Sequence, residues 1–349
     1  MPARSKHPLP QERAHQEPFA LPRSPVIGDT LALSLGKLES VLIEHPTPAP
    51  RSPLLDTVWK HVQHHHELCS YLCEEDLSED EVDEPNALTD LAGCTIPVGG
   101  IEYSVDSVLG AGNEGVVVAA TPSTGGRQIA LKLSWPLHRE RESDSREQEQ
   151  FRGFSLHELR ALCQLMPNES GSQRPEQFAV PRIIDHEFLT SPSLGNSRYA
   201  LSAIVMELIP GESRSDVLER LARAGDKKSL EILRAIIETE VRGLVWMSER
   251  GVLPLDVRGD NTRVMFAPTG ELLGVFRIDF GQSEIAGFTQ GSAFHLNGVV
   301  VGLMQRVIED EVGRRSPLWN SPPFEDLLRF SVSFRPGNTI DTLLDLLKL

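Results

Sequence analysis

The sequence lacks a hydrophobic stretch long enough to cross a membrane, and it lacks an excess of basic residues. Its longest apolar runs, around Gly302, are only a few residues long, whereas a spanning helix needs roughly 20. The formal net charge is −16, and non-specific binding to nucleic acid requires a basic surface. We therefore expect neither a membrane nor a nucleic acid among the partners.

Cysteine is also scarce, with four residues in a chain of 349. Such a chain does not suggest a disulfide framework, so we expect a reducing compartment. Residues 1–25 are rich in proline, histidine and charge, and they contain no apolar core of the kind that a secretory signal peptide has. These observations indicate a cytoplasmic protein, and a nuclear location is compatible with them.

Composition divides the chain into an N-terminal extension and one large domain. The content of 40% hydrophobic and 24% charged residues is ordinary for a soluble globular protein. Residues 1–28 have only scattered apolar positions and are expected to form a disordered tail. Helical spacing of apolar residues predicts a helical extension over 29–73, and a run of acids without a base makes 74–93 an acidic linker. Strand-like segments then begin, so we place the main domain at 94–349.

The most informative stretch is 252–261 together with 275–281. It predicts a loop, a short strand, a turn, a second strand and then an acidic turn. This hairpin brings Asp256, Asn261 and Asp279 to strand ends that meet. Two carboxylates and an amide can hold a hard divalent cation and leave one carboxylate to receive a proton.

A glycine-rich turn lies upstream. The pattern G-x-G-x-x-G occurs at Gly110, Gly112 and Gly115. In a dinucleotide-binding fold the last glycine would open a helix, but here β-branched residues, a turn and the strand 128–133 follow. A glycine hairpin lets backbone N–H groups approach phosphates closely, and the second strand carries Lys132. We therefore interpret this region as a phosphate-binding hairpin.

A lysine in such a position needs a carboxylate to hold it. A helix is expected downstream, marked by apolar residues at Phe151, Leu159, Leu162 and Leu165. Glu158 lies inside this apolar pattern, whereas Glu147 and Glu149 belong to a solvated run of charge. Glu158 is the favoured partner of Lys132.

The remaining pattern alternates strands and helices. Strands are expected at 180–184 and over 199–211, where the second runs into a Pro-Gly turn. Helices are expected at 213–224 and 229–249, the second long and amphipathic, and an apolar helix at about 294–307. One or two more helices are expected near the C-terminus.

Taken in order, these motifs resemble the protein-kinase superfamily over about 98–310. Asp256-x-x-x-x-Asn261 is similar to the catalytic loop, Asp279-Phe280-Gly281 to the metal-binding turn, and Ile129-Ala-Leu-Lys132 to the strand with the phosphate-binding lysine. The resemblance implies an α+β, two-lobed protein-kinase-like fold. An N-lobe with an antiparallel sheet and a helix would cover about 94–209, and a mainly helical C-lobe about 210–349.

The resemblance also implies roles for individual residues, with ATP and Mg²⁺ as cofactors. Phosphate contacts would come from Gly110, Gly112, Gly115 and Lys132, and Glu158 would position Lys132. Around the adenine it implies Val117, Ala130 and a connecting segment Met206, Glu207 and Leu208. Asn261 and Asp279 would bind metal, Asp256 would accept the proton of the acceptor hydroxyl, and Arg258 would take the place of a lysine that neutralises the γ-phosphate.

The chain departs from the family in places. Leu255 replaces the arginine that receives an activation-segment phosphate, no Ala-Pro-Glu motif appears, and only 349 − 281 = 68 residues follow Gly281. The helix at 294–307 has no Asp to brace the catalytic loop. We expect an ATP- and Mg²⁺-dependent phosphotransferase, foremost a divergent protein kinase with an unknown acceptor. Two alternatives stay open: a nucleotide-binding pseudokinase scaffold, and a small-molecule kinase resembling the aminoglycoside or choline phosphotransferases.

Overall fold

The computed structural model describes residues 47–48, 91–112, 115–134, 158–166, 174–190, 200–285, 295–312, 340 and 344–345. The tail expected at 1–28 lies outside these residues, as do most of the helical extension and the acidic linker.

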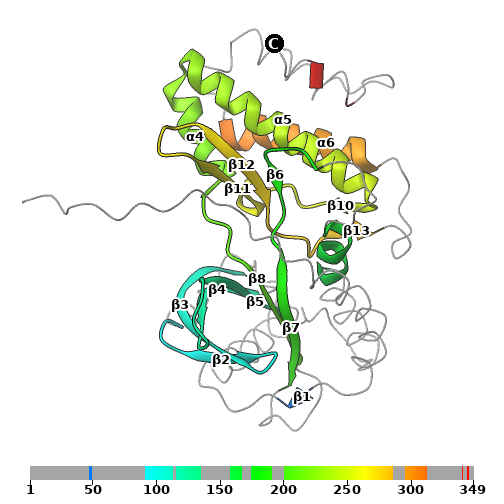
Figure 1. Ribbon diagram of the computed structural model, residues 1–349. Helices are drawn as coiled ribbons and strands as arrows, with labels where there is room; N and C mark the ends of the chain where they lie inside the picture. Colours follow the sequence, from blue (N-terminus) through cyan, green and yellow to red (C-terminus); the bar gives the residue numbers. More distant parts are fainter. Residues whose placement is uncertain are drawn as a thin grey trace, which may run out of the picture.

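A seven-stranded sheet forms one part of the molecule (Figure 1). Its strands, in spatial order, are β1 Thr47–Pro48, β7 Ile183–Thr190, β8 Ala200–Glu207, β5 Ile129–Ser134, β4 Gly115–Pro122, β3 Ile101–Gly112 and β2 Thr95–Val98. All neighbours pair antiparallel except β1 and β7, which are parallel. The structure is therefore mixed α/β, with a curled sheet that is antiparallel except at β1.

The two faces of this sheet belong to different hydrophobic clusters, because side chains alternate along a strand. On β5, Ile129, Leu131 and Leu133 pack in a cluster formed by the sheet itself. Ala130 instead packs with residues from the rest of the molecule, such as Leu159 and Phe280. Lys132 has the same parity as Ala130, so it lies on the face that looks toward the rest of the chain.

The helices begin where the sequence supplies capping residues. Helix α4, Arg214–Ala224, follows Ser213, whose hydroxyl accepts a hydrogen bond from the amide of Asp216. It ends at Gly225, which adopts φ 64°. Helix α5, Lys227–Glu249, is capped by Asp226 and begins two residues before the expected start. Residues 158–165 are also helical, and α6, His295–Arg306, continues into a π-helical turn η3, Val307–Val312.

The hairpin expected around the acidic turn is confirmed. It consists of β11 Thr262–Phe266 and β12 Leu272–Arg277, in a four-stranded sheet of order β6-β12-β11-β9 with β6 Phe178–Ala179 and β9 Glu212–Ser213. A second small sheet pairs β10 Val252–Pro254 with β13 Ser283–Ile285. The hairpin lies between the helices α4 to α6 and the seven-stranded sheet (Figure 1).

Strand boundaries upstream of the hairpin differ from the expectation. The strand expected at 180–184 is wrong at both ends, because β6 ends at Ala179 and β7 runs from Ile183 to Thr190. Pro181 has no backbone N–H, so it cannot donate to a strand ladder. The second expected strand ends at Glu207, before the Pro-Gly turn. Within the described residues, no helix is long and apolar enough for a membrane span.

Candidate active site

Three residues from distant segments meet at the face of β5 that looks toward the rest of the chain. The ammonium of Lys132 donates to Oε1 of Glu158 at 3.1 Å and lies 3.0 Å from its Oε2. The same ammonium lies 3.1 Å from Oδ1 of Asp279. The sequence predicted both the lysine and its glutamate partner, and the structure brings them together.

Burial and charge act against each other in this cluster. Burial on its own would lower the pKa of Lys132, but the carboxylates of Glu158 and Asp279 raise that pKa above its ordinary value. Burial raises the pKa of Glu158, and Lys132 opposes this effect. Burial also disfavours the ionised form of Asp279, yet Lys132 and a backbone N–H together hold the pKa of that carboxyl below its ordinary value. Lys132 is therefore charged at neutral pH, with Asp279 ionised beside it.

The acidic turn is tied to the same cluster through its backbone. The amide of Phe280 donates to Oε1 of Glu158 at 3.4 Å, and the amide of Gly281 donates to Oδ1 of Asp279 at 3.0 Å. The Phe280 ring is fully buried in the main hydrophobic cluster. Glu158 thus connects Lys132 with the turn that carries Asp279.

Asp256 lies in a loop between β10 and the short 3₁₀ helix η2, Gly259–Asn261. Its carboxylate accepts hydrogen bonds from Nε of Arg258 at 3.0 and 3.1 Å and from Nδ2 of Asn261 at 2.9 Å. The contact with Asp256 raises the pKa of the Arg258 guanidinium. Arg258 and Asn261 therefore fix the direction in which the Asp256 carboxylate points.

The residues expected to bind metal have a fitting donor set. Because Nδ2 of Asn261 donates to Asp256, its amide oxygen is the atom left for a cation. At Asp279, Oδ1 accepts from Lys132 and Gly281, which leaves Oδ2, and the side chain is 41% exposed. Carboxylate and amide oxygens suit Mg²⁺. Among the described residues, no group of three or more His, Cys, Asp or Glu side chains forms a metal site by itself.

The glycine turn joins β3 to β4, with Gly112 opposite Gly115. A Cβ atom at Gly115 would lie 2.4 Å from the carbonyl oxygen of Leu133, so this position requires glycine. By contrast, a Cβ atom at Gly110 would meet nothing within 4 Å. The expected hairpin is confirmed, and steric demand explains Gly115 but not Gly110.

The expected adenine-contacting residues lie on one face of the sheet. Val117, Ala130 and Met206 all pack against the main hydrophobic cluster, on the same face as Lys132. Downstream of Met206, the amide of Glu207 donates to the carbonyl of Arg182 at 2.9 Å. The amide of Glu207 is therefore already used within the protein.

Sequence reasoning missed a buried charge network beneath the loop that carries Asp256. The arginines Arg214 and Arg277 are 0% and 1% exposed, and each donates to a backbone carbonyl of that loop. The glutamates Glu240 and Glu311 lie beside Arg214. The α6 helix has no Asp, as its sequence indicated, but buried arginines contact the loop from α4 and β12. The sequence signal was slight, namely an arginine directly after the N-cap of α4, where a helix disfavours positive charge.

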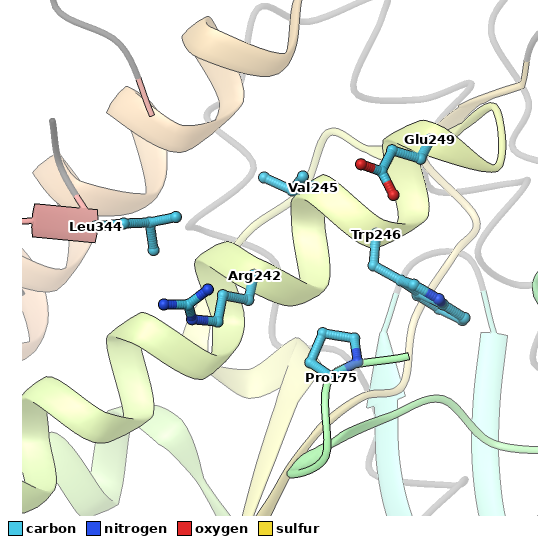
Figure 2. Close-up of a pocket in the computed structure, with 6 residues that line it drawn as sticks. All are labelled: Pro175, Arg242, Val245, Trp246, Glu249 and Leu344. Atoms are coloured by element: carbon cyan, nitrogen blue, oxygen red, sulfur yellow. The ribbon is translucent and has the colours of Figure 1, made fainter. Parts of the chain in front are cut away.

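A cavity of about 280 Å³ lies elsewhere, beside α5 (Figure 2). It is lined by Pro175, Arg242, Val245, Trp246, Glu249 and Leu344. None of these belongs to the cluster around Lys132 or Asp256, so this cavity is not part of the candidate site.

The chain was compared with protein families, curated proteins and solved structures. No protein-family model matches the chain. No curated protein matches it either. Among solved structures, the kinase domain of BubR1 aligns at a TM-score of 0.47 with 14% sequence identity, covering 74% of this chain and 82% of that one.

Proposed function

We propose that this protein is an ATP- and Mg²⁺-dependent phosphotransferase with a two-lobed kinase-like fold and a mainly helical larger lobe. The observation that carries the proposal is the contact of Lys132 with both Glu158 and Asp279, at 3.0 and 3.1 Å. Glu158 and Asp279 lie 26 and 147 positions after Lys132 in the chain. A buried, paired lysine beside an ionised carboxylate supports phosphate binding, because both charges are positioned before the ligand arrives.

Each residue then has a role that its contacts support. Lys132 neutralises the α- and β-phosphates and is held by Glu158. Asn261 and Asp279 hold Mg²⁺, which when bound neutralises charge on the phosphates. Asp256 receives the proton of the acceptor hydroxyl, and Arg258 at its side supplies positive charge near the transferred group.

The acceptor is proposed to be a protein hydroxyl. The glycine turn, Ile129–Lys132 and Asp279–Gly281 resemble protein kinases more closely than the small-molecule branch. A small hydroxyl compound is the alternative acceptor, and the two are separated by experiment.

The test combines binding with transfer. Thermal unfolding is followed with ATP and ADP, with and without Mg²⁺; ligand at 100 times its dissociation constant stabilises by about 2.7 kcal/mol. Transfer from radiolabelled ATP is then measured against a peptide library in one arm and small alcohols and amino sugars in the other. We expect an ATP shift that Mg²⁺ increases, and transfer in the peptide arm.

Two matched variants control for the charge change. Asp256→Asn removes the proposed base, whereas Asp260→Asn makes the same change at an exposed position of the same loop. Transfer is expected to be lost only in Asp256→Asn. Mg²⁺-insensitive nucleotide binding without transfer to any acceptor would instead establish the scaffold alternative.

A further inference from the structure

The loop that carries Asp256 rests on two buried arginines from different elements. Arg214 is the first residue of α4, and its Nη2 donates to the carbonyl oxygen of Val257 at 2.9 Å. Arg277 is the last residue of β12, and its Nη2 donates to the carbonyl oxygen of Asp256. Two consecutive carbonyls of one loop are thus held by two guanidinium groups.

Two glutamates hold Arg214 in place. Its Nε and Nη2 donate to the two oxygens of Glu311 in η3, at 3.0 and 2.6 Å, and its Nη1 donates to Glu240 of α5 at 2.5 Å. This two-oxygen contact with Glu311 uses the fixed planar geometry of arginine, which lysine lacks. The negative charge around Arg214 raises its pKa, although burial opposes this, so Arg214 stays protonated.

Arg277 shares the same glutamate indirectly. Thr262, opposite Arg277 in the hairpin, donates to Oε1 of Glu240 at 3.0 Å and accepts from Nη1 of Arg277 at 3.4 Å. Nε of Arg277 has no hydrogen-bond partner in the part of the chain that the structure describes, and burial lowers the pKa of Arg277 to about 10. A buried arginine with an unsatisfied nitrogen destabilises the folded state, so we expect Arg277 to have a role other than packing.

Steric contact shows independently that the loop is pressed onto α4. A Cβ atom at Gly259 would lie 2.1 Å from Oγ of Ser215 and 2.8 Å from Oε1 of Glu311. Gly259 follows Arg258 directly, within the same loop. The backbone therefore needs glycine here to approach the first turn of α4 and the carboxylate that holds Arg214.

We propose that Arg214 and Arg277 are positioning residues that fix the catalytic loop through the carbonyls of Val257 and Asp256, with Glu240 and Glu311 holding Arg214. The consequence for activity rests on the proposed function, because it concerns the orientation of the Asp256 carboxylate. The structural part of the inference does not depend on it. The loop is fixed by α4, α5 and η3 in place of the Asp that the α6 helix lacks.

The first experiment follows loop order without assuming any activity. Hydrogen exchange is measured at three amides that close the loop region: Leu255 (to Gln282 O, 2.8 Å), Asn261 (to Arg258 O, 3.1 Å) and Ile278 (to Asn261 O, 3.1 Å). In Arg214→Lys, which keeps the charge but loses the planar fork, we expect exchange at these amides to rise at least tenfold. Arg223→Lys, at an exposed ion pair in the last turn of α4, is the matched control and should leave them unchanged.

A second variant tests the packing of the same loop against α4 without changing either arginine. Gly259→Ala should also raise exchange at the three amides, whereas Gly298→Ala, where a Cβ atom meets nothing within 4 Å, should not. If both loop variants exchange at these amides as slowly as the unmodified protein, the inference is overturned. A uniform rise that includes amides in the middle of α5 and β5 would also overturn it, since it would indicate loss of general packing.

Kinetics then separate this inference from the proposed function. If transfer occurs, Arg214→Lys and Arg277→Lys should lower kcat at least tenfold while KM for ATP stays within about twofold, because Lys132 and Asp279 are untouched. An equal rise in KM would contradict a positioning role for the loop alone. If the unmodified protein transfers no phosphate, the proposed function fails, and the exchange result still decides whether the arginines fix the loop.

Discussion

The ammonium of Lys132 lies 3.0 Å from Oε2 of Glu158, and their side chains are only 15% and 4% exposed. Because the pair is so shielded, removing Lys132 leaves the Glu158 carboxylate buried without its cationic partner. The second carboxylate beside Lys132, that of Asp279, comes from the turn after β12. The pair therefore couples the order of the seven-stranded sheet to the order of the acidic turn.

The first prediction concerns this pair. Lys132→Met should destabilise the protein by about 1–3 kcal/mol, since Glu158 loses its charged partner. Lys132→Met combined with Glu158→Leu should recover part of the loss, because an apolar pair leaves less charge unpaired. Chemical denaturation of the three proteins measures this. The coupling would be contradicted if Glu158→Leu lowered the free energy of unfolding further in the Lys132→Met background, by as much as truncating an independent buried side chain.

The second prediction is the pH dependence of the Lys132–Asp279 contact. The pKa of Asp279 lies below its ordinary 3.8, so its contribution is present above that pH and is lost as the pH falls through the lowered value. The pKa of Lys132 lies above 10.5, so its contribution is present below 10.5 and lost at higher pH. The stability difference between the unmodified protein and Asp279→Asn should be present at neutral pH and shrink in strong acid, as the pH falls through the lowered pKa of Asp279.

Thermal unfolding across this pH range provides the measurement. Glu219→Gln, which removes an exposed partner of Arg223, serves as the control and should change stability by less than about 1 kcal/mol. A difference for Asp279→Asn that already disappears near neutral pH would show that Asp279 is not held ionised by Lys132.

The third prediction concerns Arg258, which is 59% exposed beside Asp256. Exposed ion pairs contribute at most about 1 kcal/mol, so Arg258→Ala should barely change stability. If Arg258 supplies positive charge to the transferred phosphoryl group, kcat should fall by roughly 10²-fold. Arg258→Lys should retain part of the activity. Arg223→Ala, another exposed arginine, controls for loss of charge, and an unchanged kcat in Arg258→Ala would remove Arg258 from the site.

The fourth prediction uses Cys163 as a reporter of the 158–165 helix. Burial raises the pKa of this thiol from 9.0 to about 11. Because the thiolate is the reactive species, alkylation by iodoacetamide at pH 8 should be roughly 100-fold slower than for an ordinary thiol. Peptide mass spectrometry after timed labelling gives the rate, and denaturant should restore the ordinary value. Fast labelling of the folded protein would show that this helix does not stay packed.

How far the sequence predicted the site depended on the kind of signal. Lys132, Glu158 and Asp279 stand in local patterns, namely a strand, an apolar helix pattern and an acidic turn. These patterns marked them as candidates before their contact was known. Helix α4 was predictable because Ser213 and Gly225 mark its ends.

The charge network was not predictable by the same means. Arg214 and Glu311 are separated by 97 residues, and no periodicity relates them. Glu240 lies within an amphipathic helix, where an acidic residue is ordinarily assigned to the solvated side. Only the packing of α4, α5 and η3 around the loop turns these charges inward. The error at β7 has a similar origin, since the strand extends to Thr190 through contacts with β8 that local sequence does not encode.

The last prediction concerns activation. Leu255 directly precedes Asp256 and is 43% exposed, so position 255 offers no cation for a phosphate. The segment after Gly281 is instead attached through its backbone: β13 pairs with β10 in antiparallel register, and the amide of Leu255 donates to the carbonyl of Gln282 at 2.8 Å. Backbone pairing requires no phosphate, so the start of this segment should be ordered without modification.

Phosphatase-treated protein should therefore transfer phosphate as fast as untreated protein, with the two rates within about twofold of each other. A difference that small would be too little to reflect the loss of a charge-assisted contact. The measurement is radiolabelled transfer before and after treatment, with removal of phosphate checked by mass spectrometry. Thr289→Ala and Ser292→Ala, at candidate sites that lie outside the described residues, should leave the rate unchanged. Transfer that arises only after an upstream kinase phosphorylates Thr289 or Ser292 would show that strand pairing is insufficient, and that a cation other than residue 255 orders the segment.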